Sequence, residues 1–143
     1  MKRVFIDSNI PMYWAGRTSE FKEPCRRMLE SVAGEELEGY ASVGVLQEIL
    51  YRFRHLKDMS VGRQIFDLFS ETATAVLSVT EQDVYLARSL SEKHSCGPRG
   101  LLHLAVMINN SIATIISVDK DFDSVGSIER VDPLDFEGWF RAG

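Results

Sequence analysis

Short apolar runs alternate along this chain with longer segments in which apolar residues recur at helical spacing. The short runs, which predict strands, are residues 2–6, 38–41, 75–79, 113–118 and 127–131. The longer segments, which predict helices, are one that begins near residue 10 and those at 20–32, 43–55, 60–72, 81–94 and 101–109. Strands separated by helices pair mostly in parallel, and helices cover both faces of such a sheet. The pattern therefore predicts an α/β fold.

Residues typical of helix ends support several of these boundaries. Gly34 can close the second predicted helix, and Ser42 can cap the third with its hydroxyl. The segment from Thr80 to Asp83 resembles a capping box, in which two side chains satisfy free N–H groups reciprocally. These signals place the strand ends next to helix starts, where a site can form.

Length and composition predict one compact domain spanning 1–143. The chain has 143 residues, of which 45% are hydrophobic and 26% are charged, as in ordinary globular proteins. No apolar run approaches the ~20 residues that cross a bilayer. Met1-Lys2-Arg3 leads directly into a strand, which is too short for a secretory signal, so we expect a cytoplasmic protein.

Cysteine content and net charge exclude few of the possible functions. Cys25 and Cys96 form no disulfide framework and lack metal-ligand spacing, so we interpret them as buried thiols. A net charge of -5 argues against a broad, non-specific grip on nucleic acid. It does not exclude a nuclease, because clustered carboxylates lower the total charge and a bound cation offsets them locally.

Acidic residues follow two of the predicted strands. Asp7 ends the first strand, and Asp119, Asp121 and Asp123 follow the strand that ends at Val118. In open parallel sheets ligands bind beyond the carboxyl ends of the strands, near the point where the strand order reverses. Carboxylates that repel one another beside a strand end are typical of a cation site, with Asp119 the preferred ligand of the three. Solvated loop acids remain an alternative.

Asp7 itself has two interpretations. A helix N-cap needs the same residue type, because the carboxylate accepts a free helix N–H. A ligand of Mg²⁺ or Mn²⁺ also fits, since hard cations prefer carboxylate oxygen. Ser8 and Asn9 could position water or phosphate oxygens beside such an ion, or could complete the cap.

Glu48 lies in a predicted helix and projects largely away from its apolar side. A solvated glutamate paired with Arg52 at i, i+4 explains it, and so does a position facing a cleft with Arg52 near phosphate. His103 lies in the apolar segment that begins at Leu101. A core histidine whose ring nitrogens are hydrogen-bonded is a simpler interpretation than a catalytic histidine. Gly100, taken alone, reads as a loop residue before that helix.

Four motifs occur in an order that resembles a known family. They are the segments 4–9, 41–50, 102–105 and 116–123, which read VFIDSN, ASVGVLQEIL, LHLA and ISVDKDFD. Together they resemble PIN-domain ribonucleases, especially the VapC-like toxins of prokaryotic toxin–antitoxin pairs. The resemblance covers nearly the whole chain.

The resemblance implies a three-layer α/β/α sandwich in which acidic residues bind Mg²⁺ or Mn²⁺ and RNA phosphodiester bonds are hydrolysed. Asp7 matches the family's first acidic position, Glu48 the second and Asp119 the fourth. The third acid falls at Gly100, and this departure predicts a metal pocket with an empty place and reduced activity. The resemblance also implies a homodimer and a cognate antitoxin that binds near the site.

Two other functions remain open at this stage. One is a catalytically weakened PIN-like module that binds RNA or an antitoxin. The other is a phospho-acceptor receiver domain, which also places acids at strand ends in a chain of this size. The strand that ends at Val79 has no aspartate after it, which counts against the receiver domain.

Overall fold

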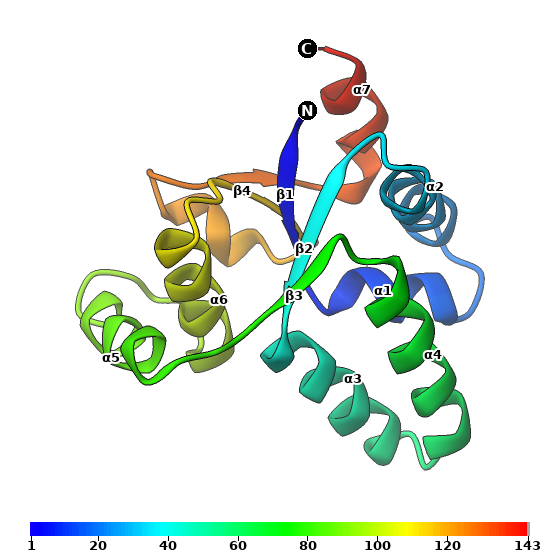
Figure 1. The fold of residues 1–143 in the computed structure, drawn as a ribbon, viewed down its shortest axis with the longest axis horizontal. Coiled ribbons are helices and arrows are strands. Elements are labelled where there is room, and N and C mark those ends of the chain that lie inside the picture. The colour runs from blue at the N-terminus through cyan, green and yellow to red at the C-terminus, as the bar shows by residue number, and fades with distance from the viewer. Residues whose placement is uncertain (143) are drawn as a thin grey trace.

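A computed structural model of the protein describes residues 1–142, and its centre is a five-stranded parallel sheet (Figure 1). The strands are β1 (Arg3–Ile6), β2 (Glu38–Ser42), β3 (Ala75–Leu77), β4 (Thr114–Ile116) and β5 (Glu129–Val131). Their order across the sheet is β3-β2-β1-β4-β5, and every neighbouring pair is parallel. The predicted sheet is therefore confirmed.

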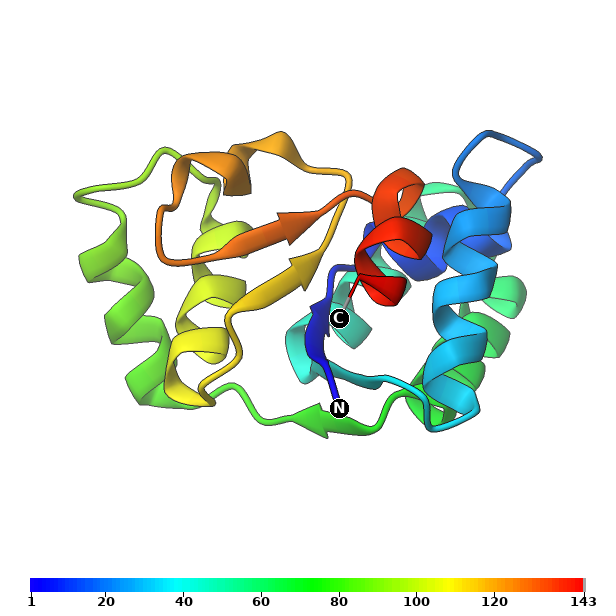
Figure 2. The same ribbon diagram turned by 90° about the horizontal axis from the view of Figure 1, so that it is seen from above.

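Helices form the outer two layers of the sandwich. They are α1 (Asn9–Ala15), α2 (Lys22–Ala33), α3 (Val43–His55), α4 (Met59–Thr72), α5 (Glu81–Leu90), α6 (Pro98–Asn109) and α7 (Phe136–Arg141). Figures 1 and 2 show α1, α2 and α4 on one side of the sheet and α5 and α6 on the other. This arrangement follows from the chain order, because the connections before β3 and after β3 run in opposite directions across the sheet.

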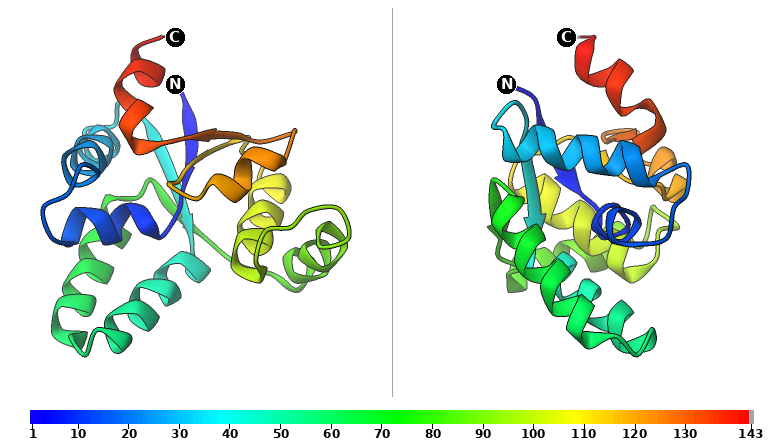
Figure 3. Two further views of the ribbon diagram at one scale, coloured as in Figure 1. Left: turned by 180° about the vertical axis from the view of Figure 1, so that it is seen from behind. Right: turned by 90° about the vertical axis from the view of Figure 1, so that its right-hand side faces the viewer.

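The strand order reverses between β1 and β4, which pair directly through Phe5 with Ile115 and Ile6 with Ile116. Ligands of open α/β sheets bind beyond the carboxyl ends of strands at such a reversal. At the opposite end of β1 the N-terminus lies near α7 (Figure 3), and the Lys2 ammonium donates to the carbonyl of Trp139. The candidate site is thus expected just past Ile6 and Ile116.

The local signals for helix ends are mostly confirmed. The Ser42 hydroxyl caps α3, Gly34 is the C-cap of α2, and the side chains of Thr80 and Asp83 form a complete capping box on α5. The sequence pattern missed α7 and two short 3₁₀ helices, η1 (Lys120–Ser124) and η2 (Pro133–Asp135). These segments are too short for a helical period to stand out, and the two 3₁₀ turns depend on aspartate caps.

Two predicted boundaries were wrong. Helix α5 ends at Leu90 rather than near residue 94, and turns follow it. Helix α6 begins at Pro98 rather than at Leu101, because proline fits the first helical position, where no backbone donor is needed. The earlier start places Gly100 inside the first turn of α6 and not in a loop.

The core lies between the sheet and both helical layers, and both cysteines belong to it. Cys25 and Cys96 are unpaired and buried, as predicted. Burial raises the pKa of the Cys25 thiol to about 12, and it also raises the pKa of Cys96. Neither thiol therefore offers a thiolate at neutral pH. Within residues 1–142 no helix is long and apolar enough to cross a membrane.

Candidate metal-binding site

Asp7 lies just past β1 and is held there by the neighbouring strand. Its backbone N–H donates to the carbonyl of Ile116 at 3.1 Å, which extends the pairing with β4 by one residue. Its carboxylate accepts from the Ser117 hydroxyl at 2.6 Å, from the Ser8 N–H at 2.7 Å and from the Asn9 amide at 3.2 Å. The carboxylate does not cap α1 in the usual way, since the N-cap residue is Ser8. Asp7 is instead an oriented, buried carboxylate.

Glu48 reaches the same place from α3 and is 5% exposed. One carboxylate oxygen accepts the Ser8 hydroxyl, and the same oxygen lies 3.9 Å from a guanidinium nitrogen of Arg99. Arg52, the predicted helical partner of Glu48, forms no ion pair with it in the described part of the chain. Of the two interpretations open from the sequence, the structure therefore supports the cleft-facing one.

The charge of Glu48 is stabilised despite its burial. Burial by itself raises the pKa of Glu48, but the His103 imidazole, the Ser8 hydroxyl and the Arg99 guanidinium together hold the pKa below its usual value. An ionised carboxylate in a buried position is the form that binds a cation.

His103 lies beneath the two carboxylates, on α6, and its side chain is 3% exposed. Its Nε2 atom is 3.2 Å from Glu48 Oε1 and 3.5 Å from Asp7 Oδ1. Neither ring nitrogen makes a hydrogen bond of acceptable geometry with any described residue. The reading of His103 as a satisfied core histidine was therefore wrong: it is buried, but it is not satisfied.

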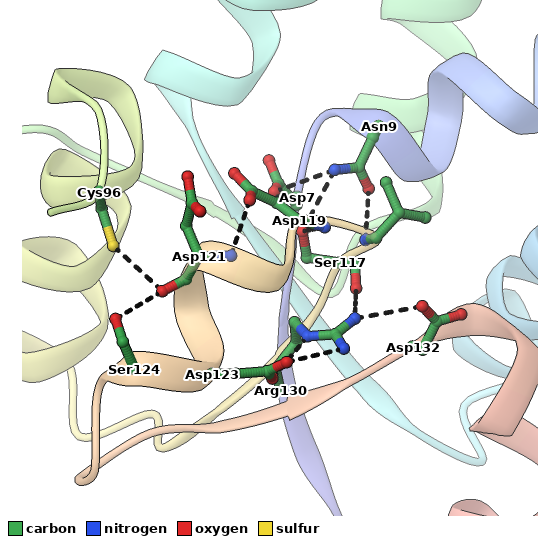
Figure 4. Close-up of polar contacts among 11 residues, drawn as sticks. Asp7, Asn9, Cys96, Ser117, Asp119, Asp121, Asp123, Ser124, Arg130 and Asp132 are labelled. Atoms are coloured by element: carbon green, nitrogen blue, oxygen red, sulfur yellow. Dashed lines mark hydrogen bonds and ion pairs between the residues drawn. The ribbon is translucent and has the colours of Figure 1, made fainter.

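Asp119 approaches the site from the loop that follows β4. Its N–H donates to the Ser117 hydroxyl at 3.0 Å, so one hydroxyl links the backbone of Asp119 to the carboxylate of Asp7 (Figure 4). The Asp119 carboxylate caps η1 by accepting the Asp121 N–H at 2.9 Å. Asp119 is exposed and lines the same cavity as Asp7 and Glu48.

The remaining two acids of the loop lie elsewhere. Asp123 pairs with the guanidinium of Arg130, with Nε to Oδ1 at 2.7 Å, and Figure 4 shows this pair turned away from Asp7. Asp121 is exposed, and its carbonyl accepts the Cys96 thiol at 3.6 Å. Neither Asp121 nor Asp123 lines the cavity of the site.

Asp7, Glu48 and His103 each offer one ligand atom, and these atoms all lie within 4.8 Å of one another. They form the floor of a cavity of about 570 Å³ at the reversal of strand order. The cavity is also lined by Ser8, Asn9, Gly100, Asp119 and three arginines, Arg17, Arg52 and Arg99. Two carboxylates and an imidazole nitrogen with no other partner suit a divalent metal ion.

Gly100 lines the cavity too and lies close to Cys96 and Phe122. A Cβ atom at this position would lie 3.3 Å from Cys96 Cβ and 3.4 Å from the Phe122 ring. Phe122, which is 1% exposed, packs against the glycine, so a side chain added there would require small shifts of its neighbours. The empty place beside the acids stays a prediction.

The sequence missed two residues of the site. Arg99 gave no signal beyond being a cation near the start of a helix. His103 could have been recognised from its spacing, since it lies three residues after Gly100 and so shares a helix face with the expected acid.

The fold and the site together define a class: α/β proteins with a cluster of groups that could hold a cation at the strand-order reversal of a parallel sheet. Comparison with known proteins makes the class specific. Residues 4–128 match the PIN domain family, and the chain belongs to it. It is 36% identical over 131 residues to the ribonuclease VapC13 of Mycobacterium tuberculosis, covering 90% of this chain and 98% of that protein.

Solved structures give the same fold. The Mycobacterium tuberculosis toxin VapC20, described as cleaving the sarcin-ricin loop, superimposes with a TM-score of 0.73 at 17% identity, covering 88% of this chain and 97% of that one. VapBC2 from Rickettsia felis, bound to a DNA fragment from its promoter, gives a TM-score of 0.72 at 16% identity, covering 91% and 98%. At these identities the likeness concerns the fold alone.

Proposed function

We propose that this protein is a metal-dependent endoribonuclease and the toxin of a toxin–antitoxin pair. The observation that carries the proposal is the placement of Asp7 and Glu48, both buried, at the floor of a cavity whose wall holds three arginines. The 36% identity to a VapC ribonuclease over nearly the whole chain supports the same activity. The receiver-domain alternative has no support, because the chain belongs to the PIN domain family.

Each residue of the cavity has a distinct task in this reaction. Asp7 and Glu48 would hold a divalent cation, which when bound lowers the pKa of water and offsets the negative charge of the phosphate. Ser117 and Asn9 fix the Asp7 carboxylate through hydrogen bonds. Asp119, on the same cavity, is placed to accept a proton from the attacking water or to add an oxygen ligand.

The arginines bind and orient the RNA backbone. Arg52 and Arg99 are exposed and flank the acids, so their guanidinium groups can pair with phosphate oxygens on either side of the bond that breaks. Hydrolysis then transfers the water oxygen to phosphorus while the bond to one ribose oxygen breaks. The cavity lacks a glycine-rich phosphate loop, so positioning depends on these side chains.

The partners of the protein follow from the same proposal. We propose a cognate antitoxin that covers the cavity, since the fold is shared with a chain of a toxin–antitoxin complex from Klebsiella pneumoniae. We also propose a homodimer. Sedimentation of the purified chain, alone and with the antitoxin, tests both partners.

Cleavage of single-stranded RNA in the presence of Mg²⁺ or Mn²⁺ tests the activity. We expect cleavage that EDTA abolishes and that Asp7→Asn lowers by at least about 100-fold. Asp67→Asn, which changes an exposed aspartate on α4, serves as the matched control and should leave the rate unchanged. Gly100→Asp restores the family's third acid and should raise the rate. If neither the natural chain nor Gly100→Asp cleaves RNA with either metal, the proposal fails.

Gly100 favours one second candidate, a catalytically weakened module that binds RNA or an antitoxin without cutting. The acid that would help retain a second ion is missing, and a side chain at position 100 would contact Cys96 and Phe122 closely. RNA binding that persists in EDTA and in Asp7→Asn, together with no cleavage by the natural chain, would favour this candidate.

A further inference from the structure

The unsatisfied imidazole of His103 is the feature that the proposed reaction leaves unexplained. A buried polar group without a hydrogen-bond partner is costly, so the presence of this one calls for a ligand. Nε2 points into the group formed by Glu48 Oε1 and Asp7 Oδ1, at 3.2 and 3.5 Å. Both contacts lie within ion-pair distance but lack the geometry of hydrogen bonds, and the three atoms are close enough together to share one cation.

We propose that His103 Nε2 is a direct ligand of the metal, so that the site is built from two carboxylates and one imidazole. This inference rests on the proposed metal-dependent function and specifies its site. The helix that presents Gly100 where an acid is expected offers His103 one turn later on the same face. With glycine at position 100, His103 is the residue of this helix that offers a ligand atom beside Asp7 and Glu48.

The nature of this ligand changes which cation is preferred. Mg²⁺ takes oxygen ligands and keeps most of its water, so a nitrogen adds little to its binding. Mn²⁺, Co²⁺ and Zn²⁺ accept imidazole, with affinity that rises along the transition series. We therefore expect the site to favour a transition metal over Mg²⁺, in contrast to a site made of carboxylates alone.

The test measures the bound metal and not the reaction. Mn²⁺ is titrated into the purified chain, and pulsed electron paramagnetic resonance of the bound ion is used to detect coupling to a ligand nitrogen. We expect a histidine ¹⁴N coupling in the natural chain and its loss in His103→Gln. His55→Gln and His94→Gln are the matched controls, because neither His55 nor His94 lines the cavity, and both should retain the coupling.

Calorimetric affinities give a second readout. His103→Gln should weaken Mn²⁺ binding by about 10- to 100-fold and change Mg²⁺ binding by less than about threefold. A histidine that only packs between the carboxylates would alter the affinities for both ions by similar factors, and that result would overturn the inference. If His103→Gln does not fold, the spectra of the natural chain and of the two control variants still show whether a histidine other than His55 and His94 is bound to Mn²⁺.

The possible failures are distinguishable. Absence of bound Mn²⁺, or bound Mn²⁺ without nitrogen coupling, refutes the ligand role of His103 even if RNA is cleaved. Nitrogen coupling in a chain that cleaves no RNA with any of these metals refutes the proposed activity and leaves the metal ligand in place.

Discussion

A single hydroxyl connects the strand, the loop and the carboxylate of the site. Ser117 is fully buried; it donates to Asp7 Oδ2 at 2.6 Å and accepts the N–H of Asp119 at 3.0 Å. Removing it takes the shortest of three hydrogen bonds from the Asp7 carboxylate and leaves the Asp119 N–H without its acceptor. Loss of a group that orients a metal ligand usually lowers metal affinity or activity, even though the group does not contact the metal itself.

We predict that Ser117→Ala lowers metal affinity and the rate of RNA cleavage by about 10- to 100-fold. The fold should persist, because the substitution removes one oxygen from a packed position. Ser124→Ala is the matched control, since its hydroxyl bonds only an exposed loop carbonyl. Calorimetric titration with Mn²⁺ and a cleavage assay measure the effect, and equal values for both variants would contradict it.

Prediction from the sequence reached its limit at the residue scale. Asp7 could be proposed because the strand pattern placed it at a strand end, whereas Glu48 was proposed only through the resemblance to PIN-domain ribonucleases. Burial of Glu48 and the lack of partners at His103 depend on how α3 and α6 meet across β1, which no local pattern encodes. The same holds for Gly100, whose neighbour Phe122 comes from a turn that the pattern missed.

At the scale of elements, Asp83 links the start of α5 to α6 through hydrogen bonds. Its carboxylate accepts the Thr80 N–H at 2.7 Å and the Asn109 amide at 2.7 Å, and the side chain is nearly inaccessible. Burial alone raises the pKa of Asp83, but these hydrogen bonds outweigh it and hold the pKa below its usual value. Because the pKa is depressed in the folded state, the stabilisation is present above the unfolded pKa of ~3.9 and is lost as pH falls through the folded pKa.

We predict that Asp83→Asn lowers the free energy of unfolding by about 1 kcal/mol at pH 7. The difference from the natural chain should shrink as pH falls below about 4, because the natural carboxyl is then protonated too. Urea unfolding at a series of pH values measures this. Asp67→Asn, on the exposed face of α4, should change little at any pH, and a pH-independent deficit for Asp83→Asn would argue against the charge as the cause.

The loop between β4 and β5 is fixed by Arg130. Its guanidinium donates to the Ser117 carbonyl at 2.9 Å, to Asp123 at 2.7 Å and to Asp132 at 3.2 Å (Figure 4). The loop between these contacts carries Asp119, so the position of that acid depends on a residue outside the cavity.

We predict that Arg130→Met lowers the free energy of unfolding by about 1 kcal/mol and slows RNA cleavage more than it weakens metal binding. The reason is that Asp7 and Glu48 remain in place while Asp119 gains freedom. Urea unfolding, calorimetry and a cleavage assay separate these effects. Arg141→Met, which removes a solvent-exposed pair with Glu137, is the control and should change none of them.

The whole molecule carries a net charge of -5, yet its cavity is lined by three arginines. We expect these three arginines to supply the main attraction for RNA, because a net negative charge disfavours a broad, non-specific grip. Binding that depends on a few phosphate contacts is expected to weaken only moderately as salt rises, because few counterions are released. This distinguishes the protein from basic nucleic-acid binders, in which charge is spread over a whole face.

We predict that the logarithm of the affinity for a short single-stranded RNA falls against the logarithm of salt concentration with a slope of about -2, as three phosphate contacts require. Arg52→Gln and Arg99→Gln should each reduce the slope by about 0.7, whereas Arg88→Gln, on the outer face of α5, should leave it unchanged. Fluorescence anisotropy with Ca²⁺ in place of the catalytic metal measures binding without cleavage. A much steeper slope that Arg88→Gln also reduces would mean that RNA contacts a broad surface, and the cavity would then no longer account for recognition.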